Sequence, residues 1–133
     1  MPPPTSPATL HIGEVAERVG LSLRTVRYYE ERGLFRPAGR TEGGFRLYTE
    51  RDVDRLRLIK QMKPLGFTVQ QMAELLTAQD SLGSGNDAAR QEAESRIAEF
   101  AEQATARCDE LREQLSRAEE FARQLAGRAV PGR

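Results

Sequence analysis

Hydrophobic residues near the amino terminus recur at the spacing of a short amphipathic helix. Ile12, Val15, Ala16 and Val19 share one face of such a helix, and the run stops at Gly20. Glycine tolerates the left-handed backbone conformation with which many helices end. The pattern therefore predicts a helix that ends just before Gly20.

A second helical run follows after only a few residues. Ser22 can cap its first turn with a side-chain oxygen, and Val26 and Tyr29 continue a helical register as far as Gly33. Two short helices with so brief a connection are typical of a helix-turn-helix.

A stretch rich in helix and strand breakers comes next. Residues 37–44 contain one proline and three glycines, and residues 45–48 alternate large apolar with polar side chains. We expect a short strand over 45–48 that belongs to a hairpin, or wing.

Two threonines mark the starts of further helices. Thr49 with Asp52, and Thr68 with Gln71, have the spacing of capping boxes, in which each side chain bonds the backbone amide of the other residue. Pro64 is expected to end the first of these helices. Their apolar faces would consist of Val53, Leu56, Ile59 and Met62, and of Val69, Met72, Ala73 and Leu76.

The carboxy-terminal part of the chain has a different period. Apolar or small residues are separated by alternating steps of four and three, which is the seam of a coiled coil sustained over about four heptads. A helix over residues 87–126 would be roughly 60 Å long, and no earlier segment is long enough to cover it. We therefore expect a homodimer in which this helix pairs with a second copy. The predicted dimerisation residues are Ile97, Ala101, Ala104, Cys108, Leu111, Leu115, Ala118, Ala122 and Leu125.

These patterns divide the chain into five parts. Residues 1–9 are expected to form a disordered tail and residues 10–78 a winged helix-turn-helix domain. Small and polar residues over 79–86 indicate a linker. The dimerisation helix would occupy 87–126, followed by a short tail over 127–133. The predicted fold class is mainly α.

The distribution of charge separates the two halves. The 133 residues carry 20 basic and 20 acidic side chains, and this neutrality alone argues against nucleic-acid binding. However, residues 1–78 hold twelve basic and nine acidic side chains, a net charge of +3, whereas residues 79–133 carry −3. Only the amino-terminal half has the charge of a nucleic-acid binder.

The chemistry of the chain argues against several classes of protein. A single cysteine, Cys108, excludes an intrachain disulfide, and a single histidine, His11, leaves no set of metal ligands or catalytic triad. We expect no cofactor and no enzyme. No apolar run has the length of a signal sequence or membrane span, so we expect a cytoplasmic protein.

The run from Ile12 to Leu34, IGEVAERVGLSLRTVRYYEERGL, closely resembles the amino-terminal signature of the MerR family of bacterial transcription regulators. The resemblance continues through residues 45–53, 65–69 and 72–76 and into the long final helix, covering roughly residues 10–126. The arginine-tyrosine-tyrosine-glutamate sequence within a helix-turn-helix is more specific than that fold alone. The resemblance to this family implies a winged helix-turn-helix followed by an antiparallel dimerisation coiled coil.

Residues 22–32 would then be the recognition helix, which enters the DNA major groove. Arg24 and Arg27 lie on neighbouring turns of one face, and we expect at least one of them, preferably Arg27, to contact bases. Tyr28 and Tyr29 are about 100° apart, so Tyr28 should face a phosphate and Tyr29 the core. Wing residues would contact the DNA backbone. The predicted DNA-binding residues are Ser22, Arg24, Thr25, Arg27, Tyr28, Arg40, Arg46 and Tyr48.

The resemblance also implies a mechanism. Family members activate a promoter with an over-long spacer by bending and untwisting it, so that RNA polymerase holoenzyme can engage both promoter elements. The alternatives are a repressor or architectural protein of the same fold without inducer, and a coiled-coil scaffold that docks protein. In the scaffold alternative, Arg24, Arg27 and Arg46 would be ordinary solvated charges.

Cys108 allows two interpretations. Metal-sensing and redox-sensing relatives carry cysteines at the start of the dimerisation helix and in a loop after it, whereas residues 77–96 and 126–133 of this chain contain neither cysteine nor histidine. The favoured interpretation is that Cys108 is a small packing residue of the seam. The alternative is that it approaches its symmetry mate and senses oxidation.

Overall fold

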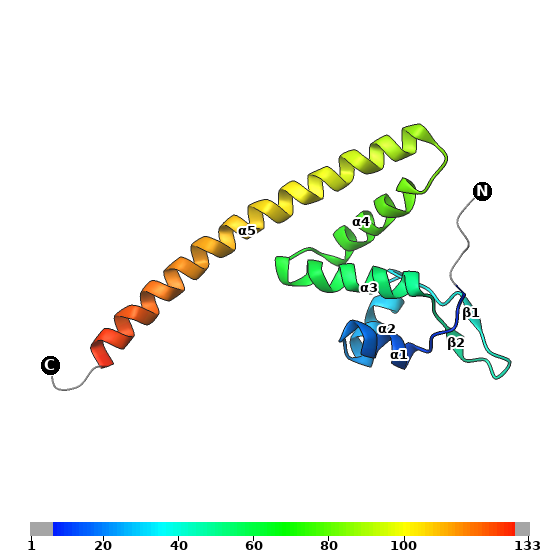
Figure 1. Ribbon diagram of the computed structural model, residues 1–133, viewed down its shortest axis with the longest axis horizontal. Coiled ribbons are helices and arrows are strands. Elements are labelled where there is room, and N and C mark those ends of the chain that lie inside the picture. The colour runs from blue at the N-terminus through cyan, green and yellow to red at the C-terminus, as the bar shows by residue number, and fades with distance from the viewer. Residues whose placement is uncertain (1–6, 130–133) are drawn as a thin grey trace.

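The chain folds into a small amino-terminal body from which one long helix projects (Figure 1). The structure, a computed structural model, describes residues 7–129. Its elements are α1 (Ile12–Val19), α2 (Leu23–Glu31), β1 (Gly39–Arg40), β2 (Arg46–Leu47), α3 (Glu50–Met62), a 3-10 turn η1 (Lys63–Leu65), α4 (Val69–Leu82) and α5 (Asp87–Ala129). This confirms the predicted fold class: mainly α, with a small wing and a long final helix.

The helix-turn-helix is formed by α1 and α2, and its ends lie where the sequence predicts them. Gly20 has the left-handed φ of 78° and ends α1. Ser22 caps α2, since its side-chain oxygen accepts a hydrogen bond of 3.1 Å from the Thr25 amide. The capping boxes of Thr49 and Thr68 begin α3 and α4. Local sequence therefore sets the end of α1 and the starts of α2, α3 and α4.

The wing, residues 39–48, is a very short antiparallel hairpin. Gly39 pairs with Leu47 and Arg40 with Arg46. The strand is shorter than the predicted 45–48, because the amide of Phe45 donates to the Thr41 side chain in the turn. Tyr48 pairs instead with Leu10 through an isolated bridge that continues the sheet on its other side.

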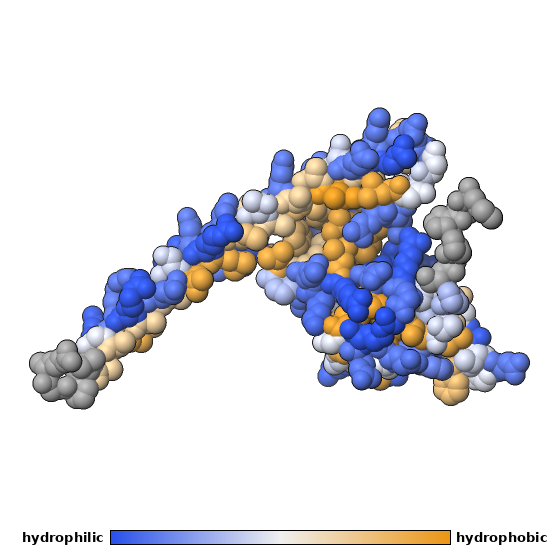
Figure 2. Space-filling model, viewed as in Figure 1, coloured by the Kyte–Doolittle hydropathy of each residue, from blue (hydrophilic) through white to orange (hydrophobic). Residues whose placement is uncertain are grey.

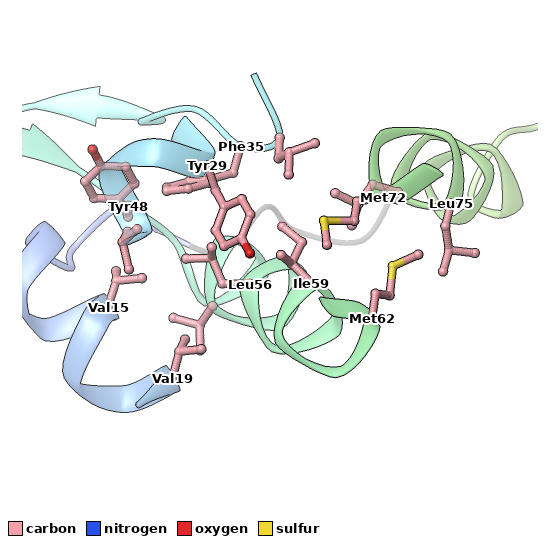
Figure 3. Close-up of a cluster of buried hydrophobic side chains, with 14 of the residues drawn as sticks. Val15, Val19, Tyr29, Phe35, Tyr48, Leu56, Ile59, Met62, Met72 and Leu75 are labelled. Carbon is pink, nitrogen blue, oxygen red and sulfur yellow. The ribbon is translucent and has the colours of Figure 1, made fainter. Parts of the chain in front are cut away.

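The core lies where α1, α2, α3 and α4 converge, and Figure 3 shows their side chains meeting. Val15 and Val26 from the helix-turn-helix and Leu56 and Ile59 from α3 are fully buried. Burying a side chain of this size contributes about 1.5–3 kcal/mol. This core fixes α2 against the rest of the body.

The predicted linker is shorter than expected, because α4 continues to Leu82 and only Gly83–Asn86 connects it to α5. Asp80 lies in the last turns of α4, where its carboxylate accepts a hydrogen bond of 2.8 Å from the Arg55 guanidinium of α3. The Arg55 guanidinium also donates to the Leu34 carbonyl at 3.2 Å. These contacts from another helix hold residues that look like a linker in a helical conformation.

The first third of α5 packs against α4 in the same chain, which corrects part of the sequence analysis. Ala93 and Phe100 are buried, and the Phe100 ring lies 5.8 Å from that of Phe67. Ile97, a predicted dimerisation residue, is half-buried against the chain's own core. The expectation that no earlier segment covers the long helix is therefore wrong for its first turns, because α4 folds back along it.

The remainder of α5 projects away from the body (Figure 1). Leu111, Leu115 and Leu125 are 36%, 59% and 47% exposed, and Phe121, which lies beside the seam, is 61% exposed. Hydrophobic side chains line one side of this projecting part in Figure 2. The helix runs three residues past the predicted end at 126.

Parts of the predicted tails can be described. The Thr9 amide donates to the Tyr48 carbonyl at 3.1 Å, so residue 9 already belongs to the wing's hydrogen bonding. Residues 1–6 and 130–133 of the two predicted tails lie outside the described residues. Over 7–129, no helix combines the length and apolar character needed to cross a membrane.

Candidate nucleic-acid interface

Helix α2 buries one face and exposes a basic one. Val26 and Tyr29 point into the core, whereas Arg24 and Arg27 are exposed. Both exposed arginines line a surface hollow of about 520 Å³ together with Tyr28. The helix thus presents guanidinium groups from two neighbouring turns on one face, as its sequence predicts.

The tyrosine doublet divides as predicted. Tyr29 is only 3% exposed, while Tyr28 is 44% exposed. Burial, and to a smaller extent the neighbouring Tyr28, raises the pKa of Tyr29. Only Tyr28 is available to a partner at this surface.

Ser22 and Thr25 lie at the start of α2 and bond each other. The Ser22 hydroxyl donates to the Thr25 hydroxyl at 2.8 Å and accepts from the Thr25 amide. Their first role is to begin the helix. The exposed Ser22 lies beside the basic face, so a DNA contact by these residues stays a prediction.

The wing forms a second hollow beside α2, which we call the wing hollow. It has a volume of about 490 Å³. Arg27 of α2 and Arg46 of β2 both line it, so the structure brings the two predicted arginines to one concavity. Its lining residues are His11, Ile12, Arg27, Gly44, Phe45, Arg46 and Tyr48. Arg40, on β1, pairs with Arg46 across the hairpin and is exposed.

Tyr48 was predicted to contact DNA from the wing, and the structure contradicts this. Its side chain is fully buried, with the ring 5.6 Å from that of Phe35. In Figure 3 its hydroxyl points away from the aliphatic side chains, and it donates a hydrogen bond to Glu30. The prediction is wrong because the bridge between Tyr48 and Leu10 turns the side chain inward.

Because Tyr48 is buried, the free energy of unfolding should depend on pH in the alkaline range. Burial, and then the hydrogen bond to Glu30, raises the pKa of Tyr48 from 10.0 to about 12. Because the folded state holds the proton more tightly, this contribution is complete below about pH 10 and is lost as the pH rises toward 12. The loss should reach roughly 2–3 kcal/mol. Denaturant unfolding at a series of pH values should show a steeper alkaline decline for the wild type than for Tyr48→Phe; equal declines would contradict it.

Three residues at this surface were not predicted from the sequence as site residues. Glu30 was not among the predicted site residues, but it bonds Arg46 and Tyr48 of the wing. Phe45 is 67% exposed at the wing, and the His11 ring lies 6.4 Å from it in an edge-on arrangement. For Glu30 the available signal is its place directly after the buried Tyr29 on a helix whose exposed face carries Arg24 and Arg27.

Possible metal ligands and the single cysteine were also located. Within residues 7–129, no three His, Cys, Asp or Glu side chains are grouped to hold an ion. Cys108 is a free, exposed thiol on the projecting part of α5.

Two family models match this chain. The one described as MerR HTH family regulatory protein matches residues 10–79, and the one described as MerR, DNA binding matches residues 53–127. The first contains the helix-turn-helix and wing, and the second contains most of α3, all of α4 and nearly all of α5.

Curated relatives agree with these matches. The mercuric resistance operon regulatory protein of Bacillus cereus is 46% identical over 69 residues, which are 52% of this chain and 52% of that protein. The HTH-type transcriptional regulator ZntR of Escherichia coli strain K12 is 42% identical over 98 residues, 67% of this chain and 69% of that protein. The chain thus spans about half the length of the first and about two thirds of the second.

Solved structures of MerR family regulators also resemble this chain. HiNmlR, a MerR family regulator lacking the sensor domain and bound to promoter DNA, is 26% identical with a TM-score of 0.70, and the match covers 88% of this chain and 83% of that one. A MerR family regulator from Bacillus thuringiensis, 21% identical with a TM-score of 0.68 over 89% of this chain and 97% of its own, supports the fold. On these matches the chain belongs to the MerR family of DNA-binding transcription regulators, and not to a class of enzymes.

Proposed function

We propose that this protein binds a pseudo-palindromic operator within a promoter as a homodimer and regulates transcription from it. The observation that carries the proposal is the shared basic surface of α2 and the wing, where Arg27 and Arg46 line one hollow. A relative of similar fold has been crystallised on promoter DNA. We place this activity in the cytoplasm, on the nucleoid.

The recognition helix α2 would enter the major groove with its exposed face. A guanidinium can bond the O6 and N7 atoms of guanine with two donors, and Arg27 is our candidate for that contact. Arg24 then contacts either a neighbouring base or a phosphate. Arg40 and Arg46 on the wing, with Tyr28 on α2, would bond the DNA backbone and fix the position of the helix.

The dimer would form through the projecting part of α5. In an antiparallel pair of heptad helices, the two seam positions of each heptad face each other in alternate layers. Such a register places Cys108 opposite Leu111 of the second copy and Ala104 opposite Leu115 of the second copy, so that each leucine meets a small residue. This pairing would cover the exposed leucines of α5 and set the distance between two recognition helices.

For the regulatory step we propose the family's mechanism, in which the bound dimer bends and untwists an over-long spacer so that RNA polymerase holoenzyme engages both promoter elements. Two recognition helices fixed on one rigid dimer can offset the deformation energy of the DNA between them. Repression without inducer is the second candidate, favoured by the absence of cysteine and histidine from residues 77–96. A bound promoter with a spacer of ordinary length would decide for repression.

Salt dependence tests the DNA-binding proposal. If the protein neutralises several phosphates, the logarithm of the binding constant should fall steeply with the logarithm of salt concentration. Because Arg46 is expected to neutralise one phosphate, Arg46→Ala should reduce that slope by roughly one unit. Fluorescence anisotropy with a labelled operator duplex, recovered by the wild type from a randomised pool, measures both. Binding indifferent to salt would overturn DNA recognition and favour a protein-docking scaffold.

A further inference from the structure

The structure assigns a positioning role to Glu30: we propose that its carboxylate fastens the wing to the recognition helix and holds Arg46 beside Arg27, so that Arg46 reaches the DNA backbone while Arg27 reaches the base edges. The inference rests on the proposed function, since it concerns the same DNA-binding surface. In this role the acidic side chain of Glu30 would increase the affinity for DNA, which is a polyanion.

Both oxygens of the Glu30 carboxylate are used by the wing. The Arg46 guanidinium donates to one oxygen at 2.7 Å, and the Tyr48 hydroxyl donates to the other. Glu30 lies in the last turn of α2, while both donors come from β2 and the residue after it. Over residues 7–129, these are the only hydrogen bonds that join α2 to the wing.

The exposure of the pair suits a tether. The Glu30 side chain is only 10% exposed, whereas that of Arg46 is 53% exposed. The carboxylate therefore lies beneath the arginine rather than on the surface, and the guanidinium keeps donors free toward solvent. A guanidinium has five N–H donors, so one contact with Glu30 leaves the group able to bond a phosphate.

The base of the wing is fixed by the pairing of Tyr48 with Leu10, whereas its short strands and turn depend on Glu30 for their position relative to α2. Each of its strands has two residues, and its turn contains Gly43 and Gly44, the latter with a left-handed φ of 84°. A two-stranded hairpin is marginally stable by itself. Holding a long arginine side chain in place before binding also reduces the rotamer entropy lost on contact with DNA.

Electrostatics alone predicts the opposite effect for Glu30. An acidic side chain at a DNA-binding surface repels phosphates, so its removal should strengthen binding. If Glu30 positions Arg46, its removal should weaken binding instead. The neighbouring Glu31 provides a matched control, since it is exposed and has no hydrogen bond or ion pair in the described part of the chain.

The experiment compares Glu30→Gln with Glu31→Gln in the full chain, using fluorescence anisotropy over a range of salt concentrations on the operator duplex. We expect Glu30→Gln to lower affinity about 5- to 10-fold and to reduce the salt slope by roughly one unit, as for the loss of one phosphate contact. Glu31→Gln should leave affinity unchanged or raise it. If Glu30→Gln binds as tightly as Glu31→Gln or the wild type, the proposal is wrong.

A double-mutant cycle separates positioning from a purely structural role. Adding Arg46→Ala to Glu30→Gln should cost less than about a further twofold, because the two side chains act through one contact. Fully additive losses would show that Glu30 does not act through Arg46. Tyr48→Phe, which keeps the buried ring and removes one donor to Glu30, is the second variant if Glu30→Gln fails to fold. It should also lose affinity, non-additively with Arg46→Ala, and unchanged affinity would overturn the tether.

These outcomes differ from a failure of the DNA-binding proposal itself. That proposal fails when the wild type shows no salt-dependent affinity for duplex DNA. The role of Glu30 fails when the wild type binds normally and only the Glu30 variants behave like the Glu31 control.

Discussion

Replacing Leu111 and Leu115 together by aspartate is expected to leave the protein monomeric and to lower its affinity for a two-half-site operator by roughly 10²- to 10⁴-fold. Both leucines lie exposed on the projecting part of α5, at the centre of the proposed seam. Charged carboxylates there would be buried without partners in the dimer. The loss of affinity follows because the second half-site would no longer be bound by a tethered copy.

The amino-terminal body is expected to fold normally in this variant. Its core is complete within one chain, because α4 and the first third of α5 pack on each other around Phe100. Affinity for a duplex with a single half-site should therefore change little, and circular dichroism should show a folded protein. Sedimentation velocity measures the oligomeric state.

A matched control adds the same charge to the outer face of α5. Gln103→Asp with Ser116→Asp introduces two aspartates at exposed positions outside the seam, and this variant should stay dimeric. If the variant with both leucines replaced sediments as a dimer, α5 pairs through another face or the copies meet elsewhere.

The local features of the fold could be predicted from sequence because each depends on a few neighbouring residues. Gly20 ends α1 since it adopts a left-handed φ, and Ser22 begins α2 through a bond three residues away. The helical period likewise separates the buried Tyr29 from the exposed Tyr28.

The features that escaped prediction depend on contacts between distant segments. The extension of α4 is held by Arg55 of α3, whose side chain bonds Asp80. Tyr48 is buried because Leu10 pairs with it, and no pattern within residues 45–48 distinguishes it from a DNA-facing wing residue. The role of Glu30 appears only when the wing is folded beside α2, since Glu30 lies 18 positions before Tyr48 in the sequence.

The candidate interface likewise combines features that local sequence predicts with features that depend on contacts between distant segments. The exposed arginines of α2 were predicted from one helical face. Their meeting with Arg46 at the wing hollow required the tertiary fold, because a hairpin can lie at many angles to a helix. The sequence therefore predicted the arginines that the fold brings to this surface, but it did not predict the part of Glu30, whose carboxylate bonds one of them.

Arg27→Ala is expected to remove sequence discrimination at one base pair of each half-site. Arg27 is exposed on α2 and lies between the two hollows of the surface, since it lines both. A two-donor contact with guanine contributes about 1–3 kcal/mol of discrimination, so affinity for the operator should fall roughly 5- to 150-fold at each half-site. Affinity for an unrelated duplex should fall much less.

The measurement is competition binding against operators changed at each base pair in turn. The wild type should reject every substitution at the pair read by Arg27, and Arg27→Ala should accept all four pairs there. Arg123→Ala on α5, which removes the same charge far along the helix, controls for net charge. If Arg27→Ala instead weakens all duplexes equally, Arg27 bonds a phosphate, and Arg24, one turn earlier on the same face, becomes the residue that reads the base.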